Sequence, residues 1–350
     1  MRSEKQRIEQ AAKWVAIVCG ILALVFFGSK QGLDYWRKES SKSATTAEEI
    51  QKVSLRLAWI PGATFTGDYV AKAQGFWKQA GLDVDIKAGG FEFDAIKLVS
   101  ADADTFGITS GPQLLQARAA GLPVVAIGAT LSRSPIGWVA KSKSKITRPQ
   151  DFVGKRIGSQ FGTHTEITLE ALMTKLGIPM SSLKRVPIKF DPRPFVVGDI
   201  DVLPVYLIDQ PIDLRAQGLT LNEIDPSDYG VSLAYGNVYF ATERTVREKP
   251  DLIRRFLRGA REGWMWTHSQ PEAATKILLQ NMPGSSETQI AEKVRATLVF
   301  AEKGQARYEG VFTMNEATWQ ETAHLLARFG DLKLSEEISR SFSNKFLVPD

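Results

Sequence analysis

Strand-like and helix-like spacings of apolar residues follow one another along the chain from residue 53 onward. The run LDVDIKA alternates strictly, with Leu82, Val84 and Ile86 on one side, and this pattern predicts a half-buried strand. The run EKPDLIRRFLRGAREGWMWTH has apolar residues three or four positions apart, which predicts a long helix. Regular alternation of strands and helices predicts parallel sheets joined by crossover helices. We therefore expect an α/β protein.

The predicted strands and helices fall into two groups, so we expect two α/β lobes. Residues 53–140 together with 237–350 form lobe I, and residues 141–236 form lobe II. The chain then crosses between the lobes twice, near residue 140 and near residue 236. A length of 350 residues is sufficient for two lobes of ordinary size.

The N-terminal residues have a different pattern. Residues 14–28, WVAIVCGILALVFFG, are continuously apolar and have Lys and Arg on both sides. Fifteen residues is short for a bilayer span and typical of a signal-peptide core. Because no cleavage site of small residues follows, residues 1–36 are predicted to be a signal anchor, in preference to a removed signal peptide or a buried helix. Residues 37–52 are polar and predict a flexible linker.

Composition narrows the function classes. The net charge is +5, but positive residues are scattered among negative ones, so a nucleic-acid partner is not expected. The single cysteine, Cys19, lies in the apolar segment, which leaves no disulfide for the rest of the chain. His164, His268 and His324 lie too far apart for a metal site built from neighbouring ligands. We expect no metal, no cofactor and no catalytic residue.

The run LAWIPGATFTGDYVAKAQGFW is the first candidate site. An apolar strand ends in a loop that carries Trp59 and Phe65, and a helix with Tyr69 follows. The helix start offers unpaired N–H groups and a partial positive charge, and the rings offer stacking surface. Ligands of open α/β sheets bind at this end of the strands. The arrangement therefore suits a planar ligand, although packing of the three rings under the helix is the alternative.

Two further turns lead from a predicted strand into a predicted helix. In ITSGPQ, Ser110 and Gly111 leave N–H groups that suit an anion or a ring acceptor. The run FGTHTE offers hydroxyls and a carboxylate, and its candidate residues are Gly162, Thr163, Thr165 and Glu166. Helix capping is the alternative for both turns, with Ser110 as one N-cap, a role compatible with ligand contact, and Thr163 with Glu166 as a capping box.

Six segments occur in order: LAWIPGATFTGDYVAKAQGFW, GLDVDI, FGITSGPQLLQARAAGLPVVAI, DFVGKRIGSQFGTHTEI, FDPRPFVVGDIDVLPVYLIDQP and YGNVYFATERTVREKPDLIRRFLRGAREGW. Together they resemble the periplasmic substrate-binding proteins of ABC importers. The branch concerned holds binders of thiamine pyrimidine precursors, riboflavin, alkanesulfonates and nitrate, and also the thiamine pyrimidine synthases. The resemblance covers roughly residues 53–330. It implies the type II periplasmic-binding-protein fold, two α/β lobes around a ligand cleft, here preceded by one N-terminal apolar helix.

The resemblance adds candidates from lobe II and the second crossing. It implies that the strand before Tyr206 ends at the cleft floor, where this ring could stack on a ligand opposite Trp59. Asp209 lies in the turn that follows, and its alternative role is turn formation ahead of a proline. Asp191 is a further candidate, and Asn237 has either a hinge or a ligand role.

The function that the resemblance implies is binding without chemistry. The lobes would close on a small molecule, and ABC permease subunits would recognise the closed monomer at the outer face of the inner membrane. The aromatic candidates favour a planar heteroaromatic, a thiamine pyrimidine precursor or a riboflavin-like molecule; small anions such as alkanesulfonate or nitrate are the alternative. A ligand-sensing module is a further alternative. A thiamine pyrimidine synthase is disfavoured, because Thr109 and Gln113 stand where that branch has Lys and His, and its cysteine-rich run is missing.

Overall fold

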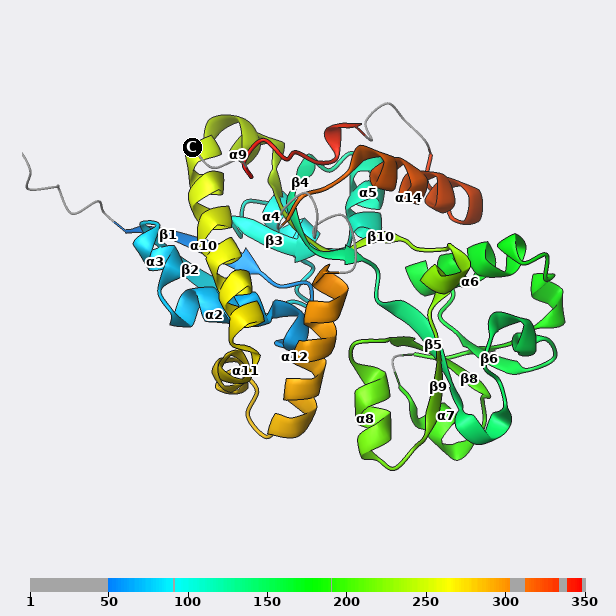
Figure 1. Ribbon diagram of the computed structural model, residues 1–350. Coiled ribbons are helices and arrows are strands. Elements are labelled where there is room, and N and C mark those ends of the chain that lie inside the picture. The colour runs from blue at the N-terminus through cyan, green and yellow to red at the C-terminus, as the bar shows by residue number, and fades with distance from the viewer. Residues whose placement is uncertain (1–49, 91, 190, 303–311, 334–338, 348–350) are drawn as a thin grey trace, which may run out of the picture. The chain divides into compact units, whose positions relative to one another are not determined.

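Two five-stranded sheets organise this computed structural model, which describes residues 50–90, 92–189, 191–302, 312–333 and 339–347 (Figure 1). The first sheet has the order β2-β1-β3-β10-β4. In it, β1 (Gln51–Arg56) pairs in parallel with β2 (Leu82–Lys87) and β3 (Phe106–Thr109). The strand β10 (Ala234–Thr242) runs antiparallel to β3 and to β4 (Val124–Arg133). The carboxyl ends of β1, β2 and β3 therefore lie at one edge.

The second sheet repeats this plan with the order β7-β6-β8-β5-β9. Its strand β6 (Arg156–Ser159) pairs in parallel with β7 (Lys184–Pro187) and β8 (Val202–Tyr206). The strand β5 (Ile136–Lys141) runs antiparallel to β8 and to β9 (Leu221–Ile224). Here too, the three parallel strands end at one edge.

The chain passes between the sheets twice, from β4 to β5 and from β9 to β10. The expected first boundary at residue 140 leaves β5 in lobe I, whereas β5 is a strand of the second sheet. Two apolar strand patterns follow one another here with only Ser134 and Pro135 between them. Such a pattern shows that each strand is buried, but not which sheet it joins.

Helices cover both faces of each sheet. One face of the first sheet packs against α2 (Thr66–Ala73), α3 (Phe76–Gln79), α10 (Pro250–Ser269), α11 (Pro271–Leu279) and α12 (Glu287–Glu302). Its other face packs against α4 (Ala95–Ser100), α5 (Gly111–Ala119) and α14 (Glu316–Phe329). The second sheet packs against α6 (His164–Lys175) on one face and against α7 (Arg193–Val197) and α8 (Gln210–Ala216) on the other. The short helix α9 (Glu243–Glu248) follows β10.

Two glycines allow α2 and α10 to approach closely. A Cβ atom on Gly263 of α10 would lie 2.2 Å from the carbonyl oxygen of Gly67 in α2. A Cβ atom on Gly67 would lie 2.3 Å from the ring of Trp264. Only glycine at both positions permits this contact, which fixes the start of α2 and hence the end of the loop that carries Trp59.

Residues 1–49 lie outside the described part of the chain, and so do the signal anchor and nearly all of the linker that the sequence predicts. Among the described residues, no helix has the length and apolar character needed to cross a membrane.

Candidate functional site

Exposed aromatic rings gather where the parallel strands end. The described residues include four exposed Trp, Phe or Tyr side chains, with 41 to 51% of their surface exposed: Trp59, Phe93, Phe161 and Tyr206. Trp59 and Phe93 lie in the loops after β1 and β2, Phe161 follows β6, and Tyr206 is the last residue of β8. Each of the two sheets thus presents two rings at the carboxyl edge of its parallel strands.

Phe93 and Phe161 were missed by sequence reasoning, although both follow a strand pattern and neighbour glycines that mark a turn. Each ring lies beside an arginine of an adjacent strand. The Arg56 guanidinium is 5.4 Å from the Phe93 centroid, and that of Arg185 is 5.2 Å from the Phe161 centroid. Such cation–π contacts orient a ring while leaving its other face open.

The Trp59 loop is joined to the loop after β2. The Gly89 N–H donates to the carbonyl oxygen of Trp59 at 3.0 Å. A Cβ atom at Gly89 would lie 1.9 Å from the carbonyl oxygen of Leu57, so a glycine is required for this approach. The two loops that carry the rings of the first sheet therefore hold each other in place.

The other two aromatic candidates are packed in the core. Phe65 is 2% exposed and Tyr69 is 7% exposed, and both belong to the apolar cluster under α2 and α10. Burial, with the neighbouring Asp68, raises the pKa of Tyr69 to about 12. The packing alternative from the sequence thus describes the environment of both rings.

At the start of α5, the capping alternative is realised. The Ser110 side chain accepts from the Gln113 N–H, and the Gln113 side chain accepts from the Ser110 N–H, which completes a capping box. A Cβ atom at Gly111 would lie 2.9 Å from the carbonyl oxygen of Ala234, so this glycine serves the close packing of α5 on β10.

At the start of α6, the capping box that was the alternative to a ligand site does not form. The hydroxyl of Thr163 donates to the Gln160 carbonyl at 2.7 Å and makes no cap bond. The Glu166 carboxylate is 7% exposed and accepts from Arg185 at 2.7 Å. Gly162 has a φ of +75°, which favours glycine, and Thr165 in the first turn is half-buried. The positive charge of Arg185, on β7 of the second sheet, thus offsets the negative charge of Glu166.

The remaining candidates have individual environments. The Asp191 carboxylate pairs with Arg193 at 2.6 Å, and this hydrogen-bonded pair lowers the pKa of Asp191. The Asp209 carboxylate lies 2.6 Å from the Lys293 ammonium of α12. Asn237 on β10 is 8% exposed, and its amide nitrogen has no hydrogen-bond partner among the described residues. It is therefore a buried donor available to a ligand or a water.

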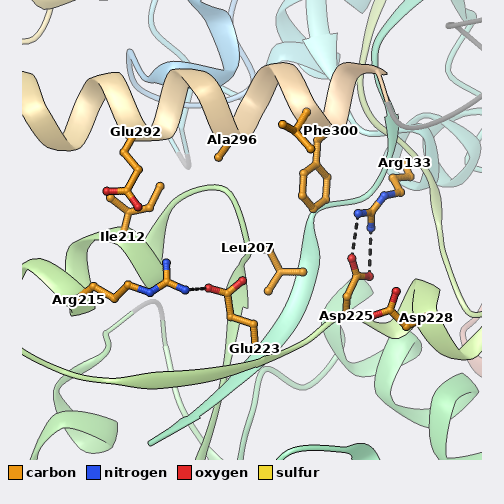
Figure 2. Close-up of a pocket in the computed structure, with 11 residues that line it drawn as sticks. Arg133, Leu207, Ile212, Arg215, Glu223, Asp225, Asp228, Glu292, Ala296 and Phe300 are labelled. Carbon is orange, nitrogen blue, oxygen red and sulfur yellow. Dashed lines mark hydrogen bonds and ion pairs between the residues drawn. The ribbon is translucent and has the colours of Figure 1, made fainter. Parts of the chain in front are cut away.

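A pocket of about 400 Å³ is lined by none of the predicted site residues. Figure 2 shows the residues that line it. The pocket lies between α12 and the α8 side of the second sheet. Its lining combines apolar side chains with paired charges: Arg133, Leu207, Ile212, Arg215, Glu223, Asp225, Asp228, Glu292, Ala296, Val299 and Phe300. No group of three or more His, Cys, Asp or Glu residues in the described ranges is arranged to hold a metal ion.

Similar proteins include both binding proteins and enzymes. The chain is 27% identical over 307 residues to the riboflavin-binding protein RibY of Chloroflexus aurantiacus, covering 85% of this chain and 86% of that protein. It is 27% identical over 309 residues to the formylaminopyrimidine-binding protein of Halalkalibacterium halodurans, covering 87% and 91%. It is 25% identical over 303 residues to the 4-amino-5-hydroxymethyl-2-methylpyrimidine phosphate synthase of Legionella pneumophila, covering 85% and 93%.

Solved structures establish a periplasmic-binding-protein-like α/β fold. The periplasmic aliphatic sulphonate binding protein SsuA from Escherichia coli matches with a TM-score of 0.63 at 16% identity, over 79% of this chain and 86% of that one. The desulfurization enzyme DszB matches with a TM-score of 0.60 at 17% identity, over 85% of this chain and 97% of that one. A binding protein and an enzyme thus share the fold, which does not decide between the two functions.

A family model described as NMT1/THI5 like matches residues 63–274, more than half of the chain. The matched region runs from the turn before α2 to α11 and so includes strands of both sheets. The chain belongs to the NMT1/THI5-like family.

Proposed function

We propose that this chain is a substrate-binding protein of an ABC importer that closes its two lobes on a planar heteroaromatic molecule. The observation that carries the proposal is the placement of four exposed rings at the carboxyl edges of the parallel strands, two on each sheet. Stacking on aromatic side chains is a favourable and geometry-tolerant way to bind a flat ring. Relatives named for riboflavin and for formylaminopyrimidine support this ligand class.

Small anions are the alternative ligand class, and the charges of the described residues favour it less. Arg193 is paired with Asp191, and Arg133 is paired with Asp225 at 2.9 Å. Each guanidinium already has a carboxylate partner, whereas a sulfonate or nitrate would need a cation or several N–H donors of its own. The sulfonate-binding neighbours support the fold alone.

A synthase activity is the alternative from the enzyme class, because several relatives are named as synthases. At the start of α5, the Thr109 hydroxyl donates to the Gln113 side chain at 3.2 Å. Neither side chain is a nucleophilic amine or an imidazole, the groups that the synthase resemblance requires at these two positions. Binding without chemistry therefore fits this site better.

The proposal extends to the partner and the place of action. ABC permease subunits would recognise the ligand-closed monomer at the outer face of the inner membrane, where residues 14–28 would anchor it. A ligand-sensing role uses the same site, and a signalling partner in place of the permease would distinguish it.

Ligand binding tests the proposal directly. The full chain, purified in detergent, is titrated with riboflavin, formylaminopyrimidine, an alkanesulfonate and nitrate in a calorimeter. Saturable one-to-one binding of a heteroaromatic and no binding of the anions is expected. Binding of an anion alone supports the alternative ligand class, turnover of a ligand supports an enzyme, and binding of none of the four rejects the proposed ligands.

Trp59→Ala tests the stacking surface. We expect it to weaken binding of the heteroaromatic by ~1–3 kcal/mol, the range found for loss of a ring under a stacked base. Met265→Ala is the control, because Met265 is 47% exposed and lies on α10, outside the loops and strand that carry the four exposed rings. Unchanged affinity of the Trp59→Ala variant in calorimetry removes this ring from the site.

A further inference from the structure

The helix α12 contacts both sheets. Ile290 and Val294 are 3% and 1% exposed and pack in the core of the first sheet. Four other residues, spaced by four, three and four positions, form a stripe along α12 that faces the second sheet, and we call it the α12 stripe: Gln289, Lys293, Ala296 and Phe300. Residues at these spacings share one side of a helix. We call each sheet with its covering helices a half of the molecule. The helix α12 thus contacts both halves.

The first anchor of the α12 stripe is an ion bridge to α8. The Lys293 ammonium lies 2.6 Å from an Asp209 oxygen and 2.7 Å from an Asp213 oxygen. Gln289 adds a long hydrogen bond to Asp213 at 3.5 Å. The Lys293 side chain is only 12% exposed, so its charge is largely removed from solvent and is satisfied by α8. One lysine therefore joins two carboxylates, one just before α8 and one within it, that come after Tyr206 at the end of β8.

The second anchor lies at the crossing of the chain. The Phe300 ring is 8% exposed and packs with the core of the second sheet. The Arg133 guanidinium at the end of β4 lies 3.9 Å from the ring centroid and pairs with Asp225 after β9 (Figure 2). This anchor lies beside the connection from β4 to β5, where the chain crosses between the two sheets.

Between the two anchors, the packing is open. Ala296 of α12, Leu207 after β8 and Ile212 of α8 line the pocket of about 400 Å³ (Figure 2). Away from the crossing, Ala296 of α12 packs partly buried against the apolar cluster of the second sheet, and α12 meets α8 through the Lys293 bridge. A contact of this kind breaks at a modest cost when the halves separate.

From these contacts we infer that Lys293 is a positioning residue, which holds the two halves together through Asp209 and Asp213 before any ligand arrives. The inference deepens the proposed function, because the bridge would raise the fraction of molecules in the binding-competent arrangement. An apparent dissociation constant varies inversely with this fraction. Loss of the bridge therefore weakens ligand binding while leaving the four exposed rings in place.

A distance measurement without ligand tests the bridge. Spin labels are placed on the full chain at Lys72→Cys in α2 and Val197→Cys in α7, both exposed, in a Cys19→Ser background. Lys293→Met keeps the alkyl chain and removes the charge, and we expect a broader and longer distance distribution than in the parent. The Asp209→Asn, Asp213→Asn double variant should give the same change from the other side of the bridge.

Arg295→Gln is the matched control, because Arg295 lies on the same helix and pairs with Glu272 of α11, within the half that contains the first sheet. It should leave the distribution unchanged. An unchanged distribution in Lys293→Met, or an equal change in Arg295→Gln, overturns the inference.

Ligand titration of the same variants separates this inference from the proposed function. If the closed fraction falls tenfold, the apparent dissociation constant for riboflavin or formylaminopyrimidine rises ~tenfold. If the parent binds neither molecule, the proposed ligand fails while the distance result still decides the role of Lys293. If the distribution broadens and the affinity does not change, the coupling of the bridge to binding is rejected.

Discussion

The buried carboxyl of Asp68 introduces a pH dependence into the core of the first sheet. The Tyr239 hydroxyl donates to one Asp68 oxygen at 2.5 Å and accepts from the Trp264 indole at 3.0 Å. The other Asp68 oxygen has no partner among the described residues, and the side chain is fully buried. Burial raises the pKa of Asp68 to about 7, against which the Tyr239 hydrogen bond acts. The folded protein therefore holds a proton here that the unfolded chain releases.

The sign of this effect is predictable. Between pH 3.8 and about 7 the folded state binds the proton and the unfolded state does not, so stability falls as pH rises through this window. Asp68→Asn keeps an acceptor for Tyr239 and cannot ionise. We expect it to be more stable than the parent at pH 8, by at most roughly 4 kcal/mol from 1.36 kcal/mol per pKa unit, and nearly equal in stability at pH 4.

Denaturant midpoints at both pH values measure this difference in stability, and the exposed Asp251→Asn variant is the control. Equal pH dependence in Asp68→Asn and parent would contradict it.

The sequence pattern of a strand followed by aromatic residues identified Tyr69 as a candidate but not the neighbouring Asp68. A ring after a strand suggests a stacking surface, but the helical phase of α2 turns Tyr69 into the core. Trp59 lies in the loop before the helix, where no helical periodicity determines which way a side chain faces, and it is 41% exposed. Phe65 was predicted to lie in the same loop and is only 2% exposed, so position in a loop did not by itself predict an exposed ring, and the orientation of Tyr69 on its helix was left open as well.

At the scale of elements, α5 and α6 connect the two halves through one side-chain pair. The His164 imidazole, in the first turn of α6, lies 2.9 Å from the Gln116 side-chain oxygen of α5. Burial lowers the pKa of His164 to about 4. The imidazole is therefore neutral at physiological pH and donates its Nε2 proton to Gln116.

Acidification should weaken this contact. Between pH 6.5 and about 4 the unfolded chain binds a proton that the folded state excludes, so stability falls as pH drops through this window. His164→Gln removes this loss. We expect the variant to lose less stability than the parent between pH 7.5 and pH 5, by up to about 2 kcal/mol.

Thermal unfolding at both pH values tests this difference, and the exposed His324→Gln variant is the control. An identical acid-induced loss in parent and His164→Gln would refute it. The Asp68 effect has the opposite sign, so the two variants separate the contributions.

The helix starts illustrate how far local sequence predicts local structure. At α5, Ser110 and Gln113 have the spacing of a capping box and form one, because every participating group lies within four residues. At α6, Thr163 and Glu166 have the same spacing, but Arg185 of β7 takes the carboxylate. A charged partner from another strand outweighs the weaker local hydrogen bond, and its position follows only from the fold.

At the scale of the whole molecule, the alternation of strands and helices was sufficient to predict an α/β protein, and the ordered segments were sufficient to predict its family. Contacts between distant segments were not predictable. Asp209 and Lys293 are far apart in sequence, and neither belongs to a pattern that indicates the other. The sheet to which β5 belongs was likewise undetermined, because burial on both faces gives the same apolar run in either sheet.

A ligand that contacts both halves should slow hydrogen exchange in both of them. Hydrogen exchange of the full chain, with and without riboflavin or formylaminopyrimidine, is followed in peptides that cover residues 57–65 and 160–166. We expect slower exchange in both peptides, because closure on the ligand restricts the loops after β1 and β6 together. A peptide from α11, which carries none of the exposed rings, is the internal control and should be unaffected. Protection of only one of the two loops means that the ligand rests on a single sheet, and in that case the rings of the other sheet serve a different purpose.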